Sequence, residues 1–97
     1  ALASRNVRLS PAGRTRALAI PRALEAARRS AQAGERRSDV IASSMVEVLH
    51  EANLHINYAT VVDADTFEDS DAVGARSAAL IAASVDGVRL IDNSFLL

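Results

Sequence analysis

Residues 77–93 read SAALIAASVDGVRLIDN, and this stretch decides the fold. Its centre, Asp86-Gly87, is a two-residue turn of the kind that tight hairpins favour, because glycine accepts a positive φ without steric penalty. An uncharged run, Ser77–Val85, leads into the turn, and Val88–Asn93 returns from it. By periodicity alone residues 78–84 also suit a helix, but the turn favours a strand. We therefore predict an antiparallel hairpin with these facing pairs: Val85 with Val88, Ala83 with Leu90, and Ala82 with Ile91.

A third strand is predicted upstream of the hairpin. Residues 55–62 are rich in β-branched and aromatic side chains, which strands favour. Simple alternation places one set of side chains on a common face: Ile56, Tyr58, Thr60 and Val62. The closing residues, Phe95, Leu96 and Leu97, are expected to pack back on the sheet.

The acidic stretch between these strands, DADTFEDSD at residues 63–71, resembles a calcium loop only superficially. It has no glycine at the sixth position, and its acids do not alternate as calcium ligands do. We interpret it as a solvated turn that Phe67 anchors to the core. His50 and His55 are five residues apart and have no evident third ligand, so we predict no metal site.

Two helical segments precede the strands. Ser10 is a good N-cap, and Pro11 follows at the first helical position, where proline is tolerated. One apolar stripe then keeps its phase through Pro21, which disfavours helical geometry before it, so the pattern fits one kinked helix or two nearly collinear ones. Gly34 is the expected stop. The stripe consists of Ala17, Ile20, Leu24, Ala27 and Ala31.

A second helix is predicted to begin at Ser38 as its N-cap, with Asp39 in its first turn and Asn53 as a left-handed C-terminal cap. Its apolar face contains Ile41, Met45, Val48, Leu49 and Ala52. The fold class is therefore α+β, with a small three-stranded antiparallel sheet and helices packed on one face. We expect residues 1–97 to form a single domain, as their number suits one domain of ordinary size.

Composition excludes several classes of function. The chain has no cysteine, which rules out disulfides, a thiolate zinc site and a cysteine nucleophile. No apolar run approaches the ~20 residues that span a bilayer. Residues 1–37 hold nine arginines against two glutamates, whereas residues 38–97 hold two arginines against ten acids. Because the chain as a whole is close to neutral, we expect the two halves to pair with each other. A nucleic-acid partner is disfavoured because aromatic stacking platforms are lacking.

The opening residues, ALASRNVRLSP, carry a small polar motif. Ser4 and Arg5 combine a hydroxyl donor with the fixed donors of a guanidinium, which suits phosphate oxygens. By itself this pair is a weak signal, because such dipeptides are common in solvated loops.

Three segments, taken together, resemble the C-terminal domain of the pantothenate synthetase (pantoate–β-alanine ligase) family. Residues 2–11, with Arg14 beyond them, are similar to the family's L-S-S-R-N-x-x-L-S-P-x-x-R segment. Residues 89–93 (RLIDN) match its closing segment, and residues 58–66 (YATVVDADT) resemble a strand and turn between the two. Two departures stand out: Ala3 replaces the first serine, and Gly13 stands where an acid is usual.

The resemblance implies an ATP-dependent ligase that forms pantoyl adenylate, releases pyrophosphate, and transfers the acyl group to β-alanine with release of AMP. It implies Ser4 and Arg5 as contacts to the phosphates of ATP, which carries Mg²⁺ held mainly by a nucleotide-binding domain outside these residues. The 97 residues would then be a lid domain of a two-domain cytoplasmic enzyme, a homodimer when whole, with no membrane or nucleic-acid partner. No catalytic residue and no metal ligand is assigned within them, and the isolated fragment is predicted to be inactive.

Two points stay open at this level. A stand-alone α+β protein-interaction module with a basic helical face is the main alternative to the ligase. Arg89 and Asp92, at the end of the hairpin, are interpreted as structural residues.

Overall fold

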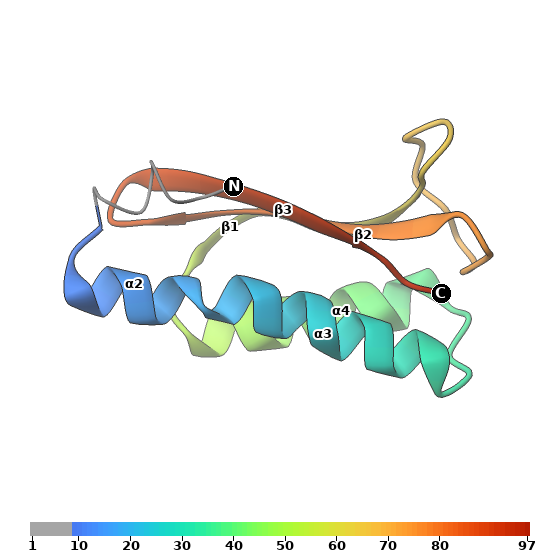
Figure 1. Cartoon of the computed structure of the whole chain (residues 1–97), viewed down its shortest axis with the longest axis horizontal. Helices are drawn as coiled ribbons and strands as arrows, with labels where there is room; N and C mark the ends of the chain where they lie inside the picture. The colour runs from blue at the N-terminus through green and yellow to red at the C-terminus, as the bar shows by residue number, and fades with distance from the viewer. Residues whose placement is uncertain (1–8) are drawn as a thin grey trace.

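The computed structural model describes residues 9–97, and the predicted hairpin forms the central strand and one edge strand of its sheet (Figure 1). β2 (Ser77–Val85) pairs with β3 (Val88–Phe95) in the predicted register, so Ala83 faces Leu90. Asp86 and Gly87 both have positive φ, 52° and 76°, as a type I′ turn requires. The choice of strand over helix for residues 78–84 is confirmed.

β1 (His55–Asp63) pairs antiparallel with β2, which gives the sheet order β1-β2-β3. The register shifts between Ile56 and Tyr58, which is a β-bulge at Asn57. A bulge inserts one residue and moves what precedes it to the other face. Ile56 therefore pairs with Ala83 on the core face, and the prediction that it shares a face with Tyr58 is wrong.

The first helical segment is two helices in line, α2 (Pro11–Ala17) and α3 (Ala19–Gln32), as Figure 1 shows. They are separated at Leu18, one turn before Pro21, because proline has no N–H to continue the ladder. Gly34 ends α3 with φ of 113°. The N–H of Gly34 donates to the Ala31 carbonyl (3.1 Å) and the N–H of Glu35 to the Ser30 carbonyl (3.0 Å), which is a Schellman motif.

α4 (Ser38–Glu51) ends as predicted at Asn53, whose φ is 60°. Its beginning differs from the prediction. Arg37 holds the N-cap position without a side-chain bond, and Ser38 is the first helical residue. The backbone explains the difference, because the N–H of Ser38 donates to the Asp71 carbonyl (3.1 Å) and Arg37 forms a β-bridge with Ala72. The buried Ser38 Oγ has no hydrogen-bond partner among the described residues.

Helices α3 and α4 cover one face of the sheet, and within residues 9–97 no helix covers the other, which we call the open face (Figure 1). Three small side chains of α3, those of Ala23, Ala27 and Ala31, are fully buried in the core. Of the closing residues Leu96 is buried in this core, whereas Phe95 and Leu97 are half exposed. The predicted packing of the tail therefore holds for Leu96. No helix within residues 9–97 combines the length and the hydrophobicity needed to cross a membrane.

The acidic segment after β1 is a turn held by hydrogen bonds within the segment. Asp63 Oδ1 accepts the N–H groups of Asp65 (2.8 Å) and Thr66 (3.3 Å). Phe67 lies outside the core with 72% of its surface exposed, so its predicted anchoring role is wrong. The backbone of Phe67, with φ of 59°, and the hydrogen bonds of the turn hold the loop without a contribution from the Phe67 side chain to the core.

The contrast between Leu90 and Ile91 on β3 tests this arrangement. Leu90 is fully buried, whereas Ile91 is 53% exposed on the open face. Leu90→Ala should lower the free energy of unfolding by about 2–5 kcal/mol through lost burial and the cavity left behind. Ile91→Ala removes a similar side chain and should cost well under half as much. Urea unfolding of the 97-residue chain measures both, and equal losses would contradict the assignment of faces.

Candidate functional site

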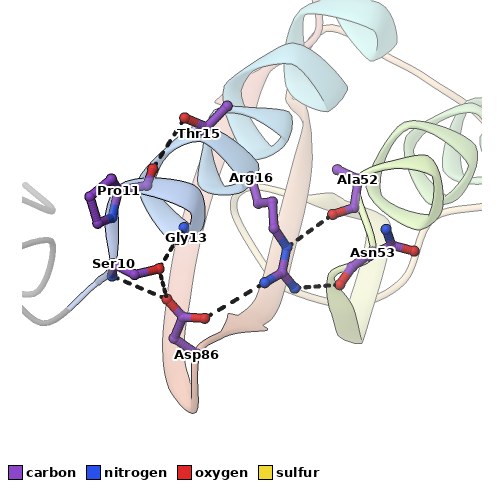
Figure 2. A network of polar contacts seen from close by, with 8 residues as sticks. All are labelled: Ser10, Pro11, Gly13, Thr15, Arg16, Ala52, Asn53 and Asp86. Carbon is purple, nitrogen blue, oxygen red and sulfur yellow. Dashed lines mark hydrogen bonds and ion pairs between the residues drawn. The ribbon is translucent and has the colours of Figure 1, made fainter.

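The two site residues predicted from sequence, Ser4 and Arg5, lie outside the described residues. What the structure describes is the point at which their segment joins the fold. Leu9 is buried in the core, and Ser10 begins α2. Ser10 and the residues linked to it are therefore the described part of the candidate site (Figure 2).

Ser10 has hydrogen bonds in two directions. Its Oγ accepts the N–H of Gly13 (2.9 Å), the local N-cap bond that the sequence predicts. Its own N–H and its Oγ–H both donate to Oδ2 of Asp86, at 3.2 and 2.9 Å. Asp86 belongs to the β2–β3 turn, so the start of α2 is bound to a residue 76 positions away.

Arg16 extends this network to a third element. Its Nη1 lies 3.6 Å from Oδ1 of Asp86. Its Nε donates to the Ala52 carbonyl (3.3 Å) and its Nη2 to the Asn53 carbonyl (2.6 Å). These carbonyls close α4, where the helix dipole favours a cation. Figure 2 shows Arg16 between the hairpin turn and the end of α4; we call Ser10, Gly13, Arg16 and Asp86 the anchor.

Gly13 makes the close approach of Asp86 possible. A Cβ at position 13 would lie 2.9 Å from Asp86 Cγ, with Asp86 Oδ2 nearer still, and 3.2 Å from Ser10 Oγ. These contacts are closer than side-chain carbon atoms tolerate, so any larger residue must displace the carboxylate. The departure noted at position 13 thus has a structural reason.

The anchor also sets the charge state of Asp86. Hydrogen bonds from the side chain and the backbone of Ser10 lower the pKa of this carboxyl below its usual value, with a smaller contribution from the Arg16 guanidinium. All three donors interact with the ionised form, which they favour. The carboxylate is therefore charged at neutral pH.

The anchor is also a place where the two oppositely charged halves of the chain meet. Arg16 with Asp86 joins the halves, whereas Glu25 and Glu35 pair with arginines of their own half. Arg76 likewise pairs with Asp65 (3.2 Å) and lies 5.2 Å from the centre of the Phe95 ring. Among these ion pairs, the expected pairing of the basic half with the acidic half is therefore found at Arg16 and Asp86, whereas the other pairs lie within one half.

Other polar groups within residues 9–97 give weaker indications of a functional site than the anchor does. A shallow hollow of about 440 Å³ at the start of α4 is lined by Asp39, Asp69 and Asp71 among others. Within residues 9–97, however, no group of three or more His, Asp or Glu side chains is placed to hold a metal ion. Asp92 Oδ1 accepts the N–H of Asn93 (2.8 Å), and the structural role of Arg89 and Asp92 stays a prediction.

Three antiparallel strands in sequential order, with helices on one face, define a small two-layer α+β fold. A family model described as pantoate-beta-alanine ligase matches residues 1–95. The chain belongs to this family.

Named relatives agree with the family match. The pantothenate synthetase of Dehalococcoides mccartyi strain CBDB1 is 44% identical over 97 residues, which are 99% of this chain and 36% of the relative. That of Rubrobacter xylanophilus is 47% identical over 98 residues, with 34% of its length covered. The crystal structure of the Thermus thermophilus enzyme superposes with a TM-score of 0.89 at 30% identity, over 96% of this chain and 34% of that one. The chain thus spans about a third of the length of these relatives.

Sequence reasoning identified Ser10 as a cap and Asp86 as a turn residue, but it did not bring them together. Ser10 lies in the first helical segment and Asp86 in the last hairpin, and no local rule connects them. Gly13 was the available signal, because an acid in this place would complete the N-terminal cap.

The pH dependence of stability should report the charge of Asp86. Its pKa is lowered in the folded state, so its contribution is present above the unfolded pKa, about 3.9, and is lost as pH falls through the folded value. Asp86→Asn keeps a turn residue that tolerates positive φ. The stability that wild type has in excess of this variant, measured as the free energy of unfolding, should be constant from about pH 7 to 5 and decrease below about pH 4.

Urea unfolding at a series of pH values measures that difference. Glu35, whose pKa is also lowered by backbone and charge contacts of Arg37, is common to both proteins and cancels. A difference that does not vary with pH would contradict the role of the Asp86 charge.

Gly13→Ala should destabilise the chain, although alanine is favoured over glycine in helices by up to ~1 kcal/mol. The added Cβ displaces the Asp86 carboxylate from Ser10. Gly74→Ala is the matched control, since its Cβ meets nothing within 4 Å and Gly74 has no positive φ. Thermal unfolding should show a lower Tm for Gly13→Ala and an unchanged or slightly higher Tm for Gly74→Ala. A rise for Gly13→Ala would disprove the close approach.

Proposed function

We propose that residues 1–97 are the C-terminal domain of an ATP-dependent ligase that condenses pantoate with β-alanine to form pantothenate. The observation that carries the proposal is the family match over residues 1–95 in a chain a third as long as its relatives. The remaining length supplies the nucleotide-binding domain, which is the main partner of this one. The whole enzyme is a homodimer that acts in the cytoplasm.

The proposed reaction has two steps. A carboxylate oxygen of pantoate attacks the α-phosphorus of ATP, and the bond to the β-phosphate oxygen breaks to release pyrophosphate. The amine of β-alanine then attacks the carbonyl carbon of pantoyl adenylate, AMP leaves, and the amine nitrogen loses a proton. A cover over the cleft keeps water away from the reactive adenylate, which is the role proposed for this domain.

Ser4 and Arg5 are proposed to bind the phosphates of ATP. Negative charge develops on the pyrophosphate oxygens as the bond to the α-phosphorus breaks, and a positioned guanidinium stabilises it. Ala3 supplies no hydroxyl where the family has serine, so this chain has one phosphate donor fewer. A neutral hydrogen bond is worth about 0.5–1.5 kcal/mol, and one to a charged group such as phosphate is worth more. The loss of one such bond is expected to lower affinity without abolishing activity.

Mg²⁺ accompanies ATP and neutralises part of the phosphate charge. Its ligands are proposed to be the phosphates and the remainder of the enzyme. Because the nucleotide-binding domain is proposed to lie outside these residues, the 97-residue chain alone is expected to form no adenylate.

Substitution of Arg5 in the whole ligase tests the phosphate role. Arg5→Ala should slow pantoate-dependent release of pyrophosphate by about 10²-fold, the usual effect of losing a transition-state donor. Arg5→Lys should recover part of the rate as a point charge. Arg8→Ala is the matched control, because Arg8 occupies an unrestricted position of the motif. Full activity of Arg5→Ala in a pyrophosphate-release assay would disprove the assignment.

A further inference from the structure

We propose that Asp86 is a positioning residue for the nucleotide-binding segment. By binding Ser10 from the β2–β3 turn, it fixes the point at which the segment that carries Ser4 and Arg5 joins the fold. The inference rests on the proposed function, because it assigns Asp86 a role through Ser4 and Arg5.

The N-terminal cap of α2 supports this role. In a capping box the N-cap side chain accepts the N–H of residue N3, and an acid at N3 accepts the N–H of the N-cap residue. Ser10 makes the first bond to Gly13, the N3 residue. The second bond, from the N–H of Ser10, goes to Asp86 instead. The acid of the capping box is thus supplied by the hairpin turn.

The local sequence at the start of α2 leaves room for this acid. Gly13 leaves open the volume that the Asp86 carboxylate fills, and any Cβ there would collide with it. An acid at position 13 would satisfy the same N–H of Ser10 without contacting the turn. The arrangement in this chain adds something that a local cap cannot provide, a direct link between α2 and the β2–β3 turn.

Ser10 is linked, directly or through Asp86 and Arg16, to two other elements of the fold. Asp86 connects it to the hairpin turn, and Arg16 connects Asp86 to the carbonyls of Ala52 and Asn53 at the end of α4. Ser10 is therefore fixed relative to the sheet and to the helical layer (Figure 2). Arg5 precedes Ser10 by five residues in the sequence.

The test uses two designs in the whole ligase. Asp86→Gly removes the carboxylate but keeps a turn sequence, Gly-Gly, that suits a type I′ hairpin. Gly13→Glu combined with Asp86→Gly places the acid at N3, restoring the cap but not the link. Asp86→Asn serves as a second single variant that retains the size of the side chain. Each is measured by thermal unfolding and by kcat and KM for ATP in pyrophosphate release.

Both single variants should lower kcat/KM for ATP about tenfold, mainly through KM, because the phosphate contacts are less well oriented. The double variant should regain the Tm of wild type and yet keep the raised KM. If the double variant regains both, Asp86 is only a helix cap and the inference is wrong. If Asp86→Gly leaves KM for ATP unchanged, the inference is also wrong.

Arg5→Ala, assayed alongside, separates the two proposals. A slow Arg5→Ala enzyme with an unaffected Asp86→Gly enzyme overturns the positioning role alone. A fully active Arg5→Ala enzyme overturns the phosphate role on which the positioning role rests.

Discussion

The contact between the Asp86 carboxylate and Ser10 is the constraint that joins the start of α2 to the β2–β3 turn. Asp86 serves two purposes there. Its backbone adopts φ of 52°, which completes the type I′ turn and so sets the register of β2 against β3. Its side chain leaves that turn toward α2 and holds the N-terminus of the helix. Asparagine and aspartate tolerate this backbone geometry, but of the two only aspartate gives α2 a negative charge.

Register then determines which residues form the core. Because side chains alternate along a strand, the pairing of Val85 with Val88 places Ala83 and Leu90 under the helices and Ala82 and Ile91 on the open face. The bulge at Asn57 brings Ile56 onto the core face beside Ala83. The core under the helices combines the buried alanines of α3 with larger side chains such as Ile20, Met45 and Leu90.

Local rules predicted the parts of the fold that local chemistry controls. The Asp86-Gly87 turn, the stop at Gly34 and the cap at Asn53 depend on single residues with positive φ, and all three are confirmed. The failures involve contacts between distant segments. Ser38 does not cap α4 because residues 36–38 pair with residues 71–73, and the face of Ile56 changed because a bulge leaves no clear sequence signal.

The site divides in the same way. Ser4 and Arg5 could be proposed from a motif, since the motif lies in one short segment. The link from Ser10 to Asp86 could not, because 76 residues separate the two and neither is unusual in its own context. The absence of an acid at position 13 indicated an incomplete cap without showing where the missing acid lies.

The anchor acts on geometry more than on stability. Arg16 and Asp86 are about one-third exposed, and ion pairs at such positions are screened by solvent and contribute little to folding. Directional hydrogen bonds to Ser10 still fix the orientation of that residue, whatever they add to the free energy of unfolding. Catalysis is sensitive to such restriction, because small displacements of a positioned donor reduce its effect on the transition state. A contact that contributes little to stability can therefore still matter to a ligase, while the hydrophobic core supplies most of the stability of the fold.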